Sequence, residues 1–247
     1  MSDDKFFSPT ADPVTPDPTP LYGSCQCNRI SYTVTPQPHQ PRPSGRSYPI
    51  KMIDHCQSCR RAHGGLLTGW VISPPSFGRL NLTLDDGTVK EVTLLDVVDA
   101  YTATTKESIT PSMKKYPGSS LAYYASSEGV IRNFCGDCGT SLTYIRDRRE
   151  DEVREKVKAK IERGEELTEE DKKWKVAVFD FTMGSLHDES LERCKADSQW
   201  WWNHGVKWIK EWAVGMGDEC VRCDVYPDGN DSAEKIVVKA DLQKEGH

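Results

Sequence analysis

Hydrophobic and polar residues alternate along several short stretches of the chain, which is typical of half-buried β-strands. On this pattern, and on short apolar runs, strands are predicted over residues 29–34, 66–72, 80–84, 89–95, 121–125, 141–145 and 175–181. Asp86 and Gly87 separate two of these segments as a hairpin turn. We therefore expect a mainly β protein, a single domain of short antiparallel strands.

One segment interrupts the strands. Residues 146–173 carry a dense run of charges in which Val153, Val157 and Ile161 recur every four positions. This spacing predicts a helix with one thin apolar stripe, and Thr168 followed by acidic residues predicts the start of a second short helix. We interpret the segment as a solvated helical insertion between two strands.

The ends of the chain differ from its middle. Residues 1–20 contain five prolines among acidic and small polar residues, which predicts a disordered leader. The folded domain is expected over residues 21–226, with a tryptophan-rich region at about 198–214, and a polar tail is expected over 227–247.

Composition narrows the classes of function. The net charge of −6 argues against a protein that binds nucleic acid through its overall charge. No stretch approaches the roughly 18 apolar residues of a membrane span. Because the first residues lack the apolar core of a secretory signal, we expect a cytoplasmic protein whose partner is a small molecule.

The cysteines carry the clearest chemistry. Six of the nine form three close pairs, which are Cys25 with Cys27, Cys56 with Cys59, and Cys135 with Cys138. In a chain without a secretory signal, such spacings favour metal binding over disulfides. One closed tetrahedral zinc site uses four thiolates and leaves two for another task. For the weaker pair, Cys220 and Cys223, we expect ordinary thiols.

The residues around these pairs resemble the glutathione-dependent formaldehyde-activating enzyme family, which shares a superfamily with centromere protein V. The matching segments are GSCQC at 23–27, CQSCR at 56–60 with Gly64 and Gly65, and RNFCGDCGT at 132–140. The resemblance extends over roughly residues 21–186, less the helical insertion.

The resemblance implies a β-rich fold with two zinc sites. The first is a closed structural site, here formed by Cys25, Cys27, Cys135 and Cys138. The second is catalytic and is bound in the family by a C-x-C-x-x-C run, whose three ligands leave one position open. In this chain that run reads Asp54-His55-Cys56-Gln57-Ser58-Cys59, so an aspartate stands where the first cysteine is expected.

Three interpretations of this difference stay open. Asp54 can replace the missing thiolate as a zinc ligand, since carboxylates bind zinc at about 2.0–2.2 Å. Alternatively, His55 or His63 completes the site. In the third interpretation the second site holds no metal, and Cys56 and Cys59 are ordinary thiols.

The family resemblance implies a carbon–sulfur lyase that adds a thiol such as glutathione to an aldehyde such as formaldehyde. Asp54, His55, Cys56 and Cys59 are then the candidate catalytic residues, and Arg60 and Arg132 are candidates for binding an anionic substrate. Two alternatives are a zinc enzyme that acts on a different, larger molecule, and a non-catalytic interaction module stabilised by zinc.

Overall fold

The fold was obtained as a computed structural model, which describes residues 17–39, 47–103, 114–127, 129–147, 151–172, 175–215 and 224–225. It is mainly β, with 38% strand and 28% helix, as the alternating pattern predicts. Most of the expected leader, the tail over 227–247, and both Cys220 and Cys223 lie outside the described residues.

A small antiparallel sheet holds the N-terminal strands and has the order β1-β2-β5-β6. Its strands are β1 (Leu21–Ser24), β2 (Ile30–Val34), β5 (Gly78–Thr83) and β6 (Val89–Thr93). Inward residues of this sheet, such as Ile30 and Leu82, are fully buried and alternate with half-buried neighbours in β2 and β5. This alternation explains why the sequence pattern predicted these two strands, whereas β1 was not predicted.

A larger sheet crosses the molecule with the order β13-β12-β3-β4-β11-β10-β9-β8-β7. Its strands are β3 (Ile50–Asp54), β4 (Thr68–Ser73), β7 (Lys114–Lys115), β8 (Leu121–Ser127), β9 (Val130–Cys135), β10 (Ser141–Arg146), β11 (Phe179–Thr182), β12 (Ser198–Trp200) and β13 (Asp224–Val225). All pairs are antiparallel except those of β12, which runs parallel to both β3 and β13. The two sheets meet in one core, where the rings of Tyr32 and Phe181 lie 4.8 Å apart.

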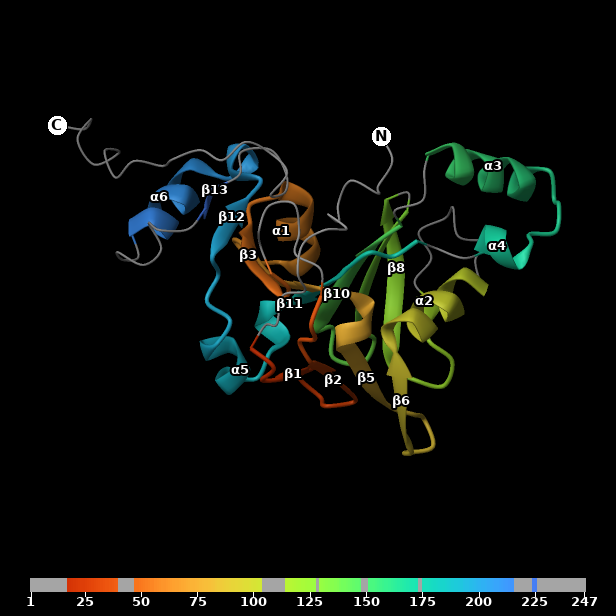
Figure 1. The fold of residues 1–247 in the computed structure, drawn as a ribbon, viewed down its shortest axis with the longest axis horizontal. Coiled ribbons are helices and arrows are strands. Elements are labelled where there is room, and N and C mark those ends of the chain that lie inside the picture. The colour runs from red at the N-terminus through yellow and green to blue at the C-terminus, as the bar shows by residue number, and fades with distance from the viewer. Residues whose placement is uncertain are drawn as a thin grey trace.

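Helices lie at the edges and ends of the sheets (Figure 1). They are α1 (Gln57–His63), α2 (Leu94–Ala103), α3 (Asp151–Glu162), α4 (Glu169–Lys172), α5 (Asp188–Glu192) and α6 (Lys207–Gly215), with the 3-10 turns η2 (Pro75–Phe77), η4 (Met183–Ser185) and η5 (Trp202–His204). The helices α3 and α4 project at one end of the molecule, where the helical insertion was expected, and α6 lies at the other end. No helix among the described residues is long and apolar enough to cross a membrane.

The structure differs from the sequence prediction at α2. Residues 89–95 were expected to form one strand, but β6 ends at Thr93 and a helix begins at Leu94. Leu94, Val97, Val98 and Tyr101 are buried at positions that repeat with helical spacing. Leu94 thus belongs to the buried face of a helix that packs beside the small sheet, whereas Leu95 is exposed.

Candidate metal centres

Four cysteine side chains converge between the two sheets. Their Sγ atoms all lie within 4.8 Å of one another. The Sγ of Cys27 lies 3.5 Å from that of Cys25 and 3.6 Å from that of Cys135. A tetrahedral zinc site with Zn–S bonds of about 2.3 Å places its sulfurs about 3.8 Å apart, so this cluster fits the closed zinc site expected for Cys25, Cys27, Cys135 and Cys138.

Two tight turns present these thiols. In the first turn, the Cys25 N–H donates to the Ile30 carbonyl at 2.9 Å, and the Ile30 N–H lies 3.3 Å from the Cys25 Sγ. In the second, the Cys135 N–H donates to the Thr140 carbonyl at 2.9 Å, and Gly139 has a φ of 77° that favours glycine. Each pair therefore sits in a preformed loop at a strand end, and the cluster joins two strands of different sheets.

A second cluster contains Asp54, Cys56 and Cys59, whose ligand atoms also lie within 4.8 Å of one another. Asp54 ends β3 and shares the buried face of that strand with Ile50 and Met52. Cys56 is the residue before α1, and Cys59 lies on the buried side of α1. The strand end and the helix start thus bring one carboxylate and two thiols together, as the first interpretation of Asp54 requires.

The Asp54 carboxylate is fixed by two hydrogen bonds. Its Oδ1 accepts from the Cys56 N–H at 2.6 Å, and its Oδ2 accepts from the Trp70 indole N–H at 3.1 Å. A carboxylate oxygen has two lone pairs, so each oxygen retains one that can face a metal ion. Such bonds to ligating carboxylates are common around metal sites because they orient the ligand.

The two thiols of this cluster differ in acidity. A hydrogen bond from the Cys59 thiol, aided by backbone N–H groups of Ser58 and Cys59, lowers the pKa of Cys56 to about 6 against the effect of burial. The pKa of Cys59 is raised because its proton is held by Cys56 and its side chain is buried. Cys56 is therefore the thiol that is ionised first, and the pair is suited to binding a cation.

Arg132 supports Cys59 from the neighbouring strand β9. One guanidinium nitrogen, Nη2, lies 3.4 Å from the Cys59 Sγ, and the other, Nη1, donates to His63 Nε2 at 3.2 Å. The guanidinium also lies over the Tyr144 ring, 4.9 Å from its centroid. Arg132 is buried beside the second cluster, and its positive charge favours the Cys59 thiolate. Its expected role in binding an anionic substrate stays a prediction.

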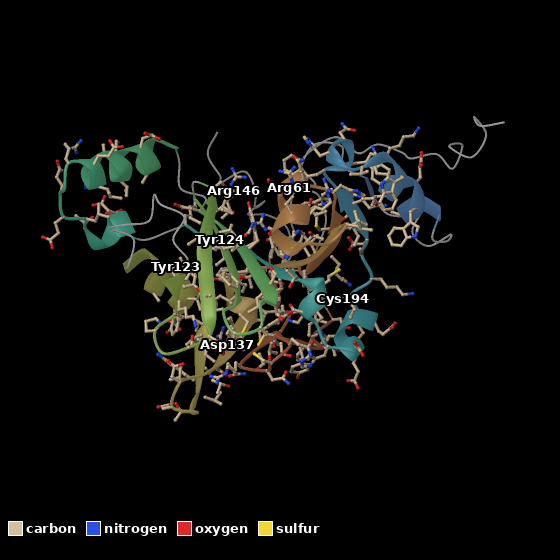
Figure 2. All side chains as sticks on the ribbon, turned by 180° about the vertical axis from the view of Figure 1, so that it is seen from behind. Arg61, Tyr123, Tyr124, Asp137, Arg146 and Cys194 are labelled. Carbon is tan, nitrogen blue, oxygen red and sulfur yellow. The ribbon has the colours of Figure 1, made fainter. Side chains whose placement is uncertain are left out.

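A cavity of about 880 Å³ opens beside the second cluster. The ring-bearing residues on its wall are Trp70, Tyr124, Tyr144, Trp200 and Trp201, and its charged residues are Asp54, Arg61, Arg132, Arg146 and Asp180. Figure 2 shows Arg61, from α1, and Arg146, from the end of β10, both at the upper middle of the view, with Tyr124 below Arg146. Arg61 therefore lines the cavity, whereas Arg60, expected to bind substrate, is not among the lining residues. Along α1, residue 61 follows 60 by about 100°, which turns it to another side of the helix.

His55 has a different place from the catalytic one that the sequence suggests. Its Nε2 donates to Gln199 Oε1 at 2.8 Å, and its ring lies edge-on to Trp202 at 4.9 Å. It is buried and belongs neither to the second cluster nor to the cavity wall. Neighbouring residues of a strand point to opposite faces, so Asp54 and His55 diverge at the end of β3. His55 therefore holds the segment around Trp200 and does not line the cavity.

The His63 side chain is hydrogen-bonded to Arg132. Because arginine is always a donor, the His63 Nε2 accepts this bond and the imidazole is neutral. Burial and the neighbouring Arg132 charge lower the pKa of His63 to about 4. This contact leaves Asp54, rather than His55 or His63, as the third candidate ligand beside Cys56 and Cys59.

The pKa of His63 predicts a pH dependence of stability. Unfolded histidine has a pKa of about 6.5, so between that value and about 4 the unfolded chain binds a proton that the folded chain does not. The stability of the fold should therefore decrease as the pH falls through this range. Thermal unfolding of His63→Gln at about pH 7 and pH 5 should show a smaller loss than the wild type, and the exposed His204→Gln should behave like the wild type. Equal losses in all three proteins would contradict this assignment.

Several cavity residues could not be found from the sequence. Trp70, Tyr144 and Trp200 lie on three different strands and have no motif in common. Strand alternation marks which side of each strand is buried, but it does not tell which strands are neighbours.

The family resemblance rests on the cysteine motifs and their flanking residues. The chain matches no protein-family model and no curated protein. The two candidate sites are therefore defined by their geometry. One is a four-cysteine cluster that can hold a metal ion, and the other is a three-ligand cluster on the wall of a cavity.

Proposed function

We propose that this chain is a zinc-dependent enzyme of carbon–sulfur lyase type, which adds a thiol such as glutathione to an aldehyde or acts on a related thiol adduct. The observation that carries the proposal is the position of Asp54, Cys56 and Cys59 beside a cavity of about 880 Å³. A closed site with four protein ligands suits a structural role, and a site with three suits catalysis because one position stays open to substrate.

A zinc ion in the three-ligand site would lower the pKa of a thiol or water in its open position, so that a nucleophile forms near neutral pH. The chain's own residues prepare that site. The Trp70 indole and the Cys56 N–H orient the Asp54 carboxylate, and Arg132 favours the ionised form of Cys59.

The charges of the cavity suit glutathione, which carries two carboxylates and one ammonium group. Arg61 and Arg146 can each hold a carboxylate through two parallel hydrogen bonds, and Asp180 provides a negative group on the same wall. The tryptophan and tyrosine rings line the apolar part of the cavity, and apolar walls of this kind strengthen polar contacts beside them.

The size of the cavity favours a second candidate, a zinc enzyme that hydrolyses, dehydrates or isomerises a larger small molecule. Small-molecule pockets occupy about 300–1,000 Å³, and this cavity lies toward the upper end of that range. An unrelated ring compound fits such a volume better than formaldehyde alone.

The test measures the exchange of isotope-labelled formaldehyde with its glutathione adduct by NMR, using the zinc-loaded protein. We expect the wild type to accelerate exchange and Cys59→Ser to lose at least about 100-fold of that acceleration, because a ligand is removed. Cys194→Ser is the matched control, since Cys194 is buried away from both clusters.

An acceleration that survives in Cys59→Ser would contradict the proposed site. If the protein binds two zinc ions but accelerates exchange with no thiol and aldehyde, the result would favour the second candidate, a zinc enzyme that acts on a larger small molecule. If the protein binds one zinc ion and accelerates no exchange, the result would favour a non-catalytic interaction module stabilised by zinc.

A further inference from the structure

The segment that follows β12 is fixed on both sides of Trp201. Trp200 lies opposite Asp54 in the pairing of β12 with β3, and its carbonyl accepts the His55 N–H at 3.0 Å. On the other side, the Trp202 ring is buried against the edge of His55, with the Lys210 ammonium 5.3 Å from its centroid. His55 thus holds the segment at two points, one on each side of Trp201.

Trp201 itself has an unusual backbone conformation. Its φ is 58° and its ψ is 37°, in the left-handed region that bulky residues rarely adopt. Residues held in such conformations persist where their neighbours over-determine them, and they cluster at functional sites. The contacts of Trp200 and Trp202 supply that constraint, so the fold accepts strain at residue 201.

The consequence of this conformation is a tryptophan ring at the cavity. Trp201 is 37% exposed, whereas Trp200 and Trp202 are only 8% and 7% exposed. It lines the cavity together with Trp200, and its ring is steadied by an edge-on contact with His204 at 5.4 Å. A glycine at this position would adopt the same backbone conformation without strain. We therefore attribute the presence of tryptophan here to its indole ring and not to the backbone conformation.

The charged groups that line the same cavity as Trp201 define what the cavity can bind. Arg61 and Arg146 are both exposed cavity residues, and the Arg132 guanidinium lies deeper, over the Tyr144 ring. Guanidinium groups bind carboxylates, and indole rings stack on flat rings. A cavity that combines the two therefore favours an anion with a planar ring over an aliphatic anion of similar charge.

We propose that the cavity takes an aromatic thiol bearing a carboxylate, or its carbonyl adduct, and that Trp201 selects this ligand by stacking on its ring. The choice of a thiol rests on the function proposed above, whereas the choice of an aromatic anion rests on Trp201 and the arginines alone. Trp201 is a specificity-determining residue in this arrangement.

The test compares the binding of three probes to the full-length, zinc-loaded chain by titration calorimetry. The probes are 2-mercaptobenzoate, with ring, carboxylate and thiol; 3-mercaptopropionate, which lacks the ring; and benzoate, which lacks the thiol. We expect 2-mercaptobenzoate to bind about 10-fold more tightly than 3-mercaptopropionate to the wild type, as expected from one stacked ring.

Three variants separate the role of Trp201 from general effects. Trp201→Gly should remove the preference for the aromatic thiol and leave 3-mercaptopropionate binding within about 2-fold of the wild type, while Trp201→Phe should keep most of the preference. Trp208→Ala is the matched control, because Trp208 is an exposed tryptophan on α6 away from the cavity, and it should change nothing. The Tm of Trp201→Gly should equal or exceed that of the wild type, since the left-handed strain is relieved.

The outcomes distinguish the two proposals. Equal affinities of the two thiols for the wild type, or an equal loss for both thiols in Trp201→Gly, would overturn the role of Trp201, even if thiol binding requires zinc. A Trp201-dependent affinity for benzoate, with no gain from the thiol group, would support the role of Trp201 while contradicting the thiol chemistry. A lower Tm together with weaker binding of all probes would identify Trp201 as a structural residue and overturn the proposal.

Discussion

Replacing Cys138 with serine should release the metal from the four-cysteine cluster and lower the free energy of unfolding by at least about 3 kcal/mol, a large part of a typical domain's stability. The reason is topological. The cluster joins turns that lie 108 residues apart at Cys27 and Cys135, so a bound ion fixes the small sheet to the strand β9. Zinc per chain and denaturant unfolding measure the two effects.

The effect of Cys138→Ser on stability distinguishes a metal-bound cluster from four cysteine thiols that hold no metal. Cys138 is exposed, and an exposed thiol without a metal should tolerate serine within about 0.5 kcal/mol. Cys194→Ser, at a buried cysteine outside both clusters, controls for the loss of a thiol and should keep its zinc. A soluble Cys138→Ser protein with unchanged zinc and unchanged unfolding would show that the cluster holds no structural metal.

Replacing Asp54 should remove the second metal ion, with a cost to stability that depends on the replacement. Asp54→Ala leaves the Cys56 N–H and the Trp70 indole without their acceptor, which should cost about 2–5 kcal/mol on the scale of unsatisfied buried donors. Asp54→Asn keeps the shape and one acceptor oxygen but not the charge. It should therefore cost less stability than Asp54→Ala, because only one of the two N–H donors loses its acceptor, while zinc falls from two ions per chain to one.

The control for this experiment is Asp180→Asn, at another carboxylate on the cavity wall that lies outside the three-ligand cluster. It should retain both zinc ions. Two zinc ions in Asp54→Asn would mean that the carboxylate only orients the loop. One zinc ion in the wild type as well would mean that Cys56 and Cys59 hold no metal in the resting protein.

The position of Asp54 shows how a local pattern and a tertiary contact combine. Strand alternation places residue 54 on the same face as Ile50 and Met52, so a buried carboxylate follows from the sequence once β3 is recognised. What makes burial tolerable is the indole of Trp70, on the adjacent strand β4. A buried charge needs such partners, and only the pairing register of β3 with β4 supplies this one.

The place of segment 198–204 in the fold could not be predicted from the sequence. The sequence marks this segment only as part of a tryptophan-rich region. The strand β12 joins β3 as a parallel neighbour more than 140 residues away in the chain, which local alternation cannot reveal. The same contact explains why the sequence did not reveal the place of His55, because a histidine beside a metal-binding motif is indistinguishable in sequence from one that holds a neighbouring strand.

The sequence by itself determined the mainly β class, the helical insertion and the three close cysteine pairs, because strand period, helix period and cysteine spacing are all local properties of the chain. The division of the candidate ligands into two groups followed from the family resemblance, and the structure brings both groups together. The tertiary structure decided which side chains surround those ligands. It brings the Arg132 guanidinium to the Cys59 thiol and the Trp70 indole to the Asp54 carboxylate. It also places Arg61 and Trp201 on the wall of the cavity. These contacts depend on the order and register of strands within a sheet, and such long-range pairings are fixed by the packing of the whole core rather than by any one segment.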